Sequence, residues 1–223
     1  MNCRRPQQPQ SPERKIRMTN EEQRACSGVC SGCEKSGSCA AAELHLKEEQ
    51  IASEEVYNGR IIRVTKDTVR LENGNEAIRE VVHHPGGACV VPLTDDGQVL
   101  MVRQFRYPHG SETLEIPAGK LEYGEDPAAC ARRELKEEVG AEADEFYSLG
   151  SLYPTPAYDR EVIYMYLARG LHFSEQSLDA DEFLDVEKLP LYEAVRRVMR
   201  DQIPDAKTQI ALLKTMQLIM GAD

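Results

Sequence analysis

Residues 119–141, GKLEYGEDPAACARRELKEEVGA, decide the fold of this 223-residue chain because they join a well-marked helix to a cluster of acidic side chains. Glu134, Glu137 and Glu138 stand at positions i, i+3 and i+4, which places their side chains on one face of a helix. Like charges this close repel one another, so the cluster calls for a cation among the carboxylates. Charged oxygen donors suit hard cations, and the spacing therefore predicts a Mg²⁺ or Mn²⁺ site.

The sequence also marks both ends of this helix. Asp126 is a suitable N-cap, Pro127 fits the first helical position, and Gly140 fits the position after the last turn. An apolar stripe at helical spacing is formed by Ala128, Ala131, Leu135 and Val139. We therefore expect one face of the helix to pack and another to present acid.

The same segment resembles the Nudix box, in which Gly is followed after five residues by Glu and after seven more by Arg-Glu-aliphatic-x-Glu-Glu-x-Gly-aliphatic. The positions in register are Gly119, Glu125, Arg133, Glu134, Glu137, Glu138 and Gly140. The alternative is a solvated acidic helix with incidental glycines, but such a match at one chosen start has a chance on the order of 10⁻⁸ from average residue usage. Ala141 departs from the bulkier aliphatic residue usual in the family, which weakens a packing contact rather than the chemistry.

The composition is that of a folded, acidic protein. Hydrophobic residues make up 41% of the chain, charged residues make up 29%, and the formal net charge is −11. This charge argues against nucleic acid or an anionic membrane as the main partner, since both require a basic surface. There is no apolar run of about eighteen residues and no apolar signal core at the N-terminus, so we expect a cytoplasmic protein.

Four of the seven cysteines lie in one Gly/Ser-rich stretch, at Cys26, Cys30, Cys33 and Cys39. In a reducing cytosol, four close cysteines predict a Zn²⁺ or iron–sulfur site more than disulfides. The first three have the C-x3-C-x2-C spacing of radical enzymes that hold a 4Fe–4S cluster, but no suitable barrel sequence follows. A flexible tail with exposed thiols is the alternative. Cys89 and Cys130 are expected to be buried as small hydrophobic residues.

The chain divides near residue 45. Residues 1–45 show no periodic pattern and predict a Cys-rich tail that is flexible unless a metal orders it. Residues 46–84 predict a small antiparallel β subdomain with Asn-Gly turns. Its expected strands are Ile51–Tyr57, Ile61–Val64, Thr68–Leu71 and Ile78–Val82.

Residues 85–223 mix strands and helices in an order that fits an α+β fold. The expected strands are Ala88–Leu93, Val99–Phe105, Leu114–Pro117, Phe146–Leu152 and Val162–Leu167, and the helices after the box are Leu191–Arg200 and Ala206–Met220. The stripe expected to pack on the last helix is Ile210, Leu213, Met216, Leu218 and Met220. The resemblance implies a Nudix-type α/β/α sandwich around a mixed sheet.

Residues that flank the box resemble the ADP-ribose pyrophosphatase branch of the family. The features typical of this branch are Gln104–Arg106, Glu115–Lys120, Pro156 and Asp205–Thr208. The branch often has Ser-Pro-Gly where this chain has Thr155-Pro156-Ala157, and losing that glycine removes backbone freedom from a substrate loop. The identity of the nucleotide sugar therefore stays open.

The resemblance implies that Glu134, Glu138 and the backbone carbonyl of Ala118 hold Mg²⁺, with Glu137 assisting. Metal ions bound there would clamp a diphosphate and lower the pKa of the attacking water. Arg133 is expected to pair with a nearby glutamate and hold the cluster in place, and Glu125 to support it. Histidine ligands are not needed, so His83, His84, His109 and His172 are expected to be ordinary surface or loop residues.

The general base in this branch usually comes from an acidic loop, here within residues 172–189. Glu182 is the first choice for the base, and Asp181, Asp179 and Glu175 are its rivals. The alternative for each of these side chains is a charged group that is exposed to solvent in the loop and has no catalytic role. With Glu134 and Glu138 from the box, Glu182 completes the predicted catalytic set.

Arginine suits phosphate because its planar fork donates two hydrogen bonds. Arg106 is the best candidate for binding the substrate, and Arg79 is the second. The alternative for each is an arginine on the solvent-exposed face of a strand. The resemblance implies that the small sheet swaps onto a partner subunit, so that Arg79 reaches the neighbour's site. That predicts a homodimer. Glu161 is expected to contact the terminal ribose.

Two functions from different classes fit these residues. The first is Mg²⁺-dependent hydrolysis of ADP-ribose, or a related nucleoside diphosphate sugar, to AMP and ribose 5-phosphate. The second is a nucleotide-binding sensor or regulatory module whose Cys-rich tail responds to metal or redox state. The intact set of glutamates favours catalysis, because binding alone does not require every ligand.

Overall fold

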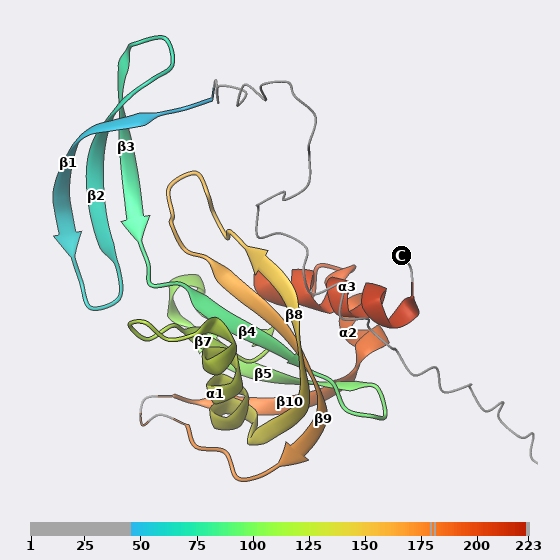
Figure 1. Ribbon diagram of the computed structural model, residues 1–223. Coiled ribbons are helices and arrows are strands. Elements are labelled where there is room, and N and C mark those ends of the chain that lie inside the picture. The colour runs from blue at the N-terminus through green and yellow to red at the C-terminus, as the bar shows by residue number, and fades with distance from the viewer. Residues whose placement is uncertain (1–45, 179, 181, 222–223) are drawn as a thin grey trace, which may run out of the picture. The chain divides into compact units, whose positions relative to one another are not determined.

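The computed structural model describes residues 46–178, 180 and 182–221, and Figure 1 shows how their helices and strands are arranged. The strands are β1 (Glu49–Asn58), β2 (Arg63–Arg70), β3 (Glu76–His83), β4 (Gly87–Pro92), β5 (Gln98–Arg106), β6 (Ser111–Glu115), β7 (Ala118–Lys120), β8 (Ala141–Leu152), β9 (Ile163–Phe173) and β10 (Leu184–Pro190). The helices are α1 (Pro127–Val139), α2 (Leu191–Val198), α3 (Ala206–Met220) and the short 3-10 helix η2 (Tyr107–His109). The predicted residues that lie outside the described ones are Cys26, Cys30, Cys33, Cys39, Asp179 and Asp181.

The strands β1, β2 and β3 form an antiparallel meander in the order of the sequence (Figure 1). The expectation of two separate strands at Ile61–Val64 and Thr68–Leu71 is wrong, because Arg63–Arg70 is one continuous strand. Its middle residues, Thr65 to Asp67, include no glycine or proline that would interrupt pairing with both neighbours.

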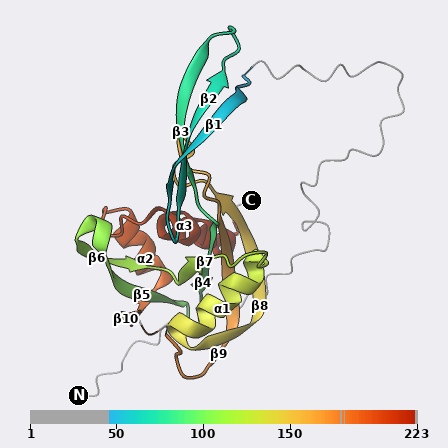
Figure 2. The same ribbon diagram turned by 90° about the vertical axis from the view of Figure 1, so that its left-hand side faces the viewer.

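The central strand β4 explains the layers of the main domain. All its residues are buried, and successive side chains of a strand point to opposite faces. Ala88 and Val90 pack in the cluster that contains α1, whereas Cys89 and Val91 pack in the cluster that contains α2 and α3. Figure 2 shows α1 on one side of these strands and the other two helices on the opposite side. The predicted α/β/α sandwich is therefore confirmed.

The strands between the helices form two sheets. The first is the predicted mixed sheet, in the order β7-β4-β9-β8, with β4 and β9 parallel and the other pairs antiparallel. The second is antiparallel, in the order β10-β5-β6. Strand β10 was not predicted from the sequence, because Asp185, Glu187 and Lys188 hide the apolar pattern of this edge strand.

Helix α1 keeps the predicted limits. Asp126 caps it by accepting hydrogen bonds from Ala128 N at 3.0 Å and Ala129 N at 3.1 Å, and Gly140 ends it with a φ of 61°. The side chains of α1 that are buried are Cys130, Ala131, Glu134, Leu135, Glu138 and Val139. Cys130 is thus buried as predicted, and two glutamates lie in the packed face rather than on an open acidic one.

The predicted packing face of α3 is wrong in part. Leu213, Leu218 and Met220 are exposed. The buried residues of α3 are Thr208, Ala211, Leu212 and Thr215. Leucine, isoleucine and methionine occur on several sides of this helix, so they did not identify the buried side. Neither α3 nor another described helix is long and apolar enough to cross a membrane.

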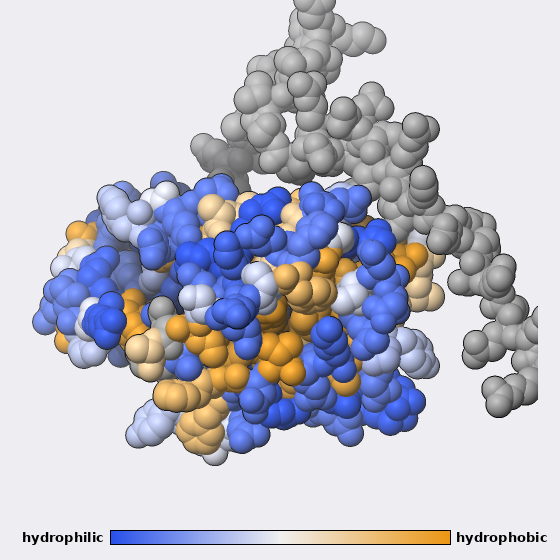
Figure 3. Space-filling view, turned by 90° about the horizontal axis from the view of Figure 1, so that it is seen from below, coloured by the Kyte–Doolittle hydropathy of each residue, from blue (hydrophilic) through white to orange (hydrophobic). Residues whose placement is uncertain are grey.

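Apolar side chains also remain on the surface of the main domain. Figure 3 shows a central patch of hydrophobic residues within a hydrophilic rim on the face seen from below. Among the described residues, Phe173 at the end of β9, Phe183 before β10 and Val186 within β10 are exposed. Exposed apolar surface is therefore not confined to the three-stranded sheet.

Candidate active site

Two glutamates of α1 are buried beside the strand that starts the box. Glu134 and Glu138 have only 6% and 3% of their surface exposed. Burial and the neighbouring Glu134 raise the pKa of Glu138 to about 8, although a hydrogen bond from Ala118 N at 3.0 Å opposes this rise. Burial also raises the pKa of Glu134, and Arg133 opposes it. Two buried carboxylates of this kind favour the binding of a cation.

Gly119 is the position of the box that the geometry explains most directly. A Cβ atom on this residue would overlap the carboxylate of Glu134. Gly119 lies in β7 and pairs with Ala88 of β4, so the backbone cannot easily move away from the helix. Glycine therefore lets the strand approach the carboxylates closely, and the resulting set of carboxylate and backbone oxygens fits Mg²⁺.

Arg133 links the acidic residues of the box, as predicted. Its guanidinium lies 3.1 Å from Glu125, 2.7 Å from Glu134 and 3.0 Å from Glu137. The hydrogen bond with Glu125 makes the largest contribution to raising the pKa of Arg133, and the other two carboxylates add to it. Within the described part of the chain, no three His, Cys, Asp or Glu side chains are close enough to form a metal site. Arg133 thus bridges two of the carboxylates that were predicted to ligate.

The loop after β9 is anchored to the C-terminal end of α1. Three hydrogen bonds run from this loop to backbone carbonyls that the helix leaves open. They join Ser174 N to Gly140 O at 2.6 Å, Ser177 N to Glu137 O at 3.1 Å, and Gln176 Nε2 to Glu138 O. The loop that carries the predicted base therefore starts at the helix that carries the glutamates.

Glu182 lies within the electrostatic reach of the box. Its charge contributes to raising the pKa of both Glu134 and Glu138. Glu175, its described rival, is exposed in the anchored part of the loop. The structure thus brings Glu182 toward the buried pair.

Arg106 faces the buried carboxylate of Glu115, which was not predicted to be a site residue. Its Nε and Nη2 atoms donate to Glu115 at 2.8 and 2.7 Å, and Glu115 is 1% exposed. These hydrogen bonds are the main cause that raises the pKa of Arg106, and the charge of Glu138 adds to it. Arg106 therefore lies beside the box, with one edge of its guanidinium held by Glu115.

Lys207 is the second residue of this cluster that was missed as a site residue. Its ammonium donates to Glu115 and, at 2.9 Å, to Asp205. The charge of Lys207 also lowers the pKa of Glu138, so the lysine acts on the box. The sequence contains one indication that Glu115 has a special role: this charged residue stands between the apolar residues Leu114 and Ile116.

Glu161 lies beside the first residues of β4. Its Oε1 atom is 3.1 Å from Nδ1 of His84, and a Cβ on Gly87 would be 3.9 Å from the same oxygen. Gly87 pairs with Lys120 of β7, so Glu161 is close to the start of the box. His84 was expected to be an ordinary loop residue, but it partners this glutamate.

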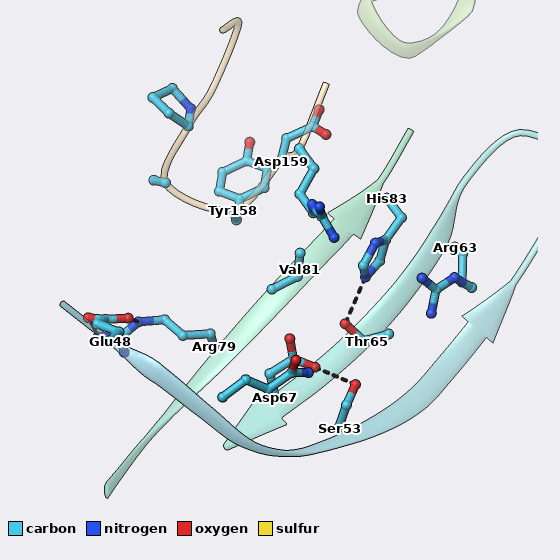
Figure 4. A pocket seen from close by; sticks show the side chains of 14 residues that line it. Glu48, Ser53, Arg63, Thr65, Asp67, Arg79, Val81, His83, Tyr158 and Asp159 are labelled. Carbon is cyan, nitrogen blue, oxygen red and sulfur yellow. Dashed lines mark hydrogen bonds and ion pairs between the residues drawn. The ribbon is translucent and has the colours of Figure 1, made fainter. Parts of the chain in front are cut away.

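Arg79 lies apart from the box glutamates, in a cavity of about 700 Å³ between the three-stranded sheet and residues 156–160 (Figure 4). Two hydrogen bonds join side chains that line this cavity, one between Ser53 and Asp67 and one between Thr65 and His83. The guanidinium of Arg79 pairs with Glu48, with Nε 2.9 Å from Oε2. No box glutamate is among the described residues that line this cavity.

Two family profiles and several known proteins are similar to this chain. Residues 83–211 match the profile described as NUDIX domain, and residues 48–82 match that described as nucleoside diphosphate sugar hydrolase N-terminal domain. The chain is 41% identical to the methanol dehydrogenase activator of Bacillus methanolicus and 40% identical to the ADP-ribose pyrophosphatase of Bacillus subtilis (strain 168). Each alignment spans 169 residues, 75% of this chain and 91% of the relative. A crystal structure of an ADP compounds hydrolase shares the fold, with a TM-score of 0.70 at 24% identity over 78% of this chain and 95% of that one.

Proposed function

This chain belongs to the Nudix family of hydrolases, and from that premise we propose that it cleaves the pyrophosphate of ADP-ribose or a related nucleoside diphosphate sugar with the help of Mg²⁺. With ADP-ribose, water adds across the phosphoanhydride bond and the products are AMP and ribose 5-phosphate. The observation that carries the proposal is the buried pair Glu134 and Glu138 against the backbone of Ala118 and Gly119. The similarity to a named ADP-ribose pyrophosphatase supports the choice of substrate.

The residues that would hold the metal are Glu134, Glu138 and the carbonyl of Ala118, with Glu137 assisting. Mg²⁺ suits these oxygen donors, and Mn²⁺ is a chemically close substitute. When bound, the ion neutralises the diphosphate and lowers the pKa of the attacking water.

The remaining roles follow from the side chains around the box. Glu182 accepts the proton of the attacking water, and its effect on the pKa of the box glutamates supports this assignment. Arg106 donates to a phosphate oxygen while Glu115 orients its guanidinium. Glu161, beside the start of the box, accepts a hydrogen bond from the terminal ribose.

The decisive experiment is hydrolysis of a panel of nucleotide sugars with and without Mg²⁺. Wild type is compared with Glu138→Gln and with Glu122→Gln, which makes the same change at an exposed position of the segment outside the box pattern. We expect Mg²⁺-dependent turnover by wild type and the control alone. If wild type turns over no member of the panel, the hydrolase proposal is rejected. Undiminished turnover by Glu138→Gln rejects the metal assignment instead.

We also propose a cytoplasmic homodimer in which Arg79 of one subunit serves the site of the other. All ten residues of β1 are exposed, including Ile51, Val56 and Tyr57. An exposed edge strand with apolar side chains is a template for pairing with another chain. The position of Arg79 in a cavity without box glutamates also favours a role across the interface.

The Cys-rich tail supports the alternative function, a sensor that responds to metal or redox state. We propose that Cys26, Cys30, Cys33 and Cys39 bind Zn²⁺ or an iron–sulfur cluster. Elemental analysis of the purified full chain, beside a variant with all four changed to serine, tests this. Equal zinc and iron contents in the two proteins exclude a tail site, and hydrolysis by the variant at the wild-type rate separates the tail from catalysis.

A further inference from the structure

The first turn of α3 contacts the strand segment that leads into the box. Lys207 donates to the carboxylate of Glu115, and both side chains are almost fully buried. Asp205 accepts from the same ammonium at 2.9 Å and from Thr208 N at 2.9 Å, which caps the helix. We call Asp205, Lys207 and Thr208 the α3 clamp.

The second contact of the α3 clamp is made by a hydroxyl. Thr208 Oγ1 accepts a hydrogen bond from Ile116 N at 3.0 Å, and both residues are fully buried. Strand β6 ends at Glu115, so the N–H group of Ile116 is the first one beyond the ladder. A buried N–H group requires a partner, and here a side chain from α3 supplies it.

The clamped segment leads directly to the proposed metal ligands. Only Pro117 separates Ile116 from Ala118, and its ring restricts the backbone between them. Pro117 O accepts from Val90 N at 3.0 Å, and Ala118 N donates to Glu138 Oε2 at 3.0 Å. A shift at residues 115–116 is therefore passed on to the carbonyl of Ala118 and the carboxylate of Glu138.

We propose that Lys207 and Thr208 are positioning residues for the metal site. They hold residues 115–118 so that the Ala118 carbonyl and the Glu138 carboxylate keep the spacing that binds a divalent cation. This inference rests on the proposed function, which assigns those two groups as ligands. Residues that orient metal ligands typically contribute about 10- to 100-fold to metal affinity.

A matched control separates positioning from a role in folding alone. Thr215 lies on the same helix and is fully buried, and its hydroxyl has no hydrogen-bond partner among the described residues. Thr208→Val and Thr215→Val thus exchange the same atoms in two buried places. One exchange breaks a hydrogen bond to the segment that leads to the box, and the other breaks none.

The test measures Mn²⁺ binding to the full chain without substrate, from the electron paramagnetic resonance signal of the free ion. We expect Thr208→Val to weaken Mn²⁺ binding about tenfold, Thr215→Val to leave it unchanged, and Thr208→Ser to restore it. The Mg²⁺ concentration for half-maximal hydrolysis should rise in parallel, while KM for the nucleotide sugar at saturating Mg²⁺ stays within about twofold.

Lys207→Met gives a second measurement, with Lys207→Arg as the conservative variant. Lys214→Met is the control, because Lys214 lies on the same helix and donates to Leu149 O at 2.6 Å, outside the clamp. Lys207→Met should bind Mn²⁺ about tenfold more weakly than Lys214→Met, and Lys207→Arg should recover part of the loss. This arm decides the question if Thr208→Val does not fold.

The outcomes distinguish the two proposals. Wild-type Mn²⁺ affinity in both Thr208→Val and Lys207→Met overturns the positioning role and leaves the hydrolase untouched. Absence of Mn²⁺ binding by wild type rejects the ligand assignment, and the positioning role with it.

Discussion

Among residues, Glu138 carries the sharpest conflict between stability and function. It is 3% exposed, and burial and Glu134 raise its pKa to about 8. Without a bound cation, a carboxyl with a raised pKa destabilises the folded state above its ordinary value of 4.5, because folding then requires it either to take up a proton or to stay charged while buried. In buffer with a chelator, we therefore expect Glu138→Gln to raise Tm by about 2–4 °C. In buffer with Mg²⁺, the same variant should lower turnover at least about 100-fold. Differential scanning fluorimetry and the hydrolysis assay measure the two effects. A lower Tm for the variant in chelator contradicts this account.

Glu115 should have the opposite effect on stability. Burial raises its pKa, but Arg106 and Lys207 outweigh burial and lower the pKa to about 2. A lowered carboxyl pKa stabilises the fold above its ordinary value of 4.5, and this contribution is lost as the pH falls toward 2. We expect Glu115→Gln to cost about 3 kcal/mol at pH 7, because it removes the buried carboxylate that pairs with Arg106 and Lys207.

The cost of Glu115→Gln also depends on pH. The stability gap between wild type and Glu115→Gln should narrow as the pH falls from 4.5 to 2, because wild type then loses the contribution of the carboxylate. Urea unfolding followed by circular dichroism across this range measures the gap. The matched control is Glu187→Gln, which alters a more exposed Arg–Glu cluster with Arg103 and Arg197. A gap that stays constant from pH 7 to pH 2 refutes the role of Glu115.

Among the contacts between site residues, those that join residues close together in the chain could be predicted from the sequence. The spacing of Glu134, Glu137 and Glu138 is itself a statement about one helix face, and Arg133 stands within one turn of two of them. The hydrogen bond from Lys207 to Glu115 spans 92 positions, so no periodic pattern can indicate it. The structure was needed to connect Asp205–Thr208 with the box.

Among the elements, the end of α1 offers a prediction that separates backbone strain from a steric clash. Gly140 has a φ of +61°, and a Cβ there would overlap Ser174 O in the anchored loop. Gly110 has nearly the same φ, +62°, but a Cβ would meet no atom of the described residues within 4 Å. Gly110→Ala should therefore cost only about 1 kcal/mol from strain, whereas Gly140→Ala should cost at least about twice as much.

The contact between Gly140 and the loop after β9 should also affect catalysis. Gly140→Ala displaces Ser174 and with it the segment that leads to Glu182, so we expect kcat to fall about tenfold while Gly110→Ala keeps the wild-type value. Urea titrations and steady-state kinetics of both variants provide the measurement. Equal losses of stability and of kcat in the two variants show that the contact with Ser174 is unimportant.

The elements that the sequence predicted well are those with clear ends and one buried face. Helix α1 has a capping Asp126, Pro127 and Gly140, and its limits were predicted correctly. Strand β10 and the buried face of α3 were not, because charges hide the first and apolar residues surround the second. The strand state of β10 and the buried face of α3 both depend on packing against neighbouring elements, which the pattern of a single segment does not show.

For the whole molecule, the proposed dimer predicts complementation between two inactive subunits. Glu138→Gln lacks a metal ligand and Arg79→Ala lacks the arginine that serves the neighbour. When both are co-expressed, half of the dimers are mixed and each mixed dimer has one complete site. About a quarter of the wild-type activity should therefore return.

The control for this experiment is Arg70→Ala. Arg70 is exposed on the same sheet and does not line the cavity, so this variant alone should keep the wild-type activity. Size-exclusion chromatography with light scattering gives the oligomeric state of each preparation. Activity of the mixture no greater than the sum of its parts refutes the exchange of Arg79 between subunits.

The contacts of the α3 clamp also bear on how the protein is made. They join Glu115 to Lys207 and Ile116 to Thr208, each pair separated by 92 positions. During synthesis, every residue of the box leaves the ribosome long before residue 208 does. A nascent or prematurely terminated chain therefore displays the box glutamates without the contacts that hold residues 115–118 in place. Emergence of α3 from the ribosome is the step at which the nascent polypeptide can first complete these contacts.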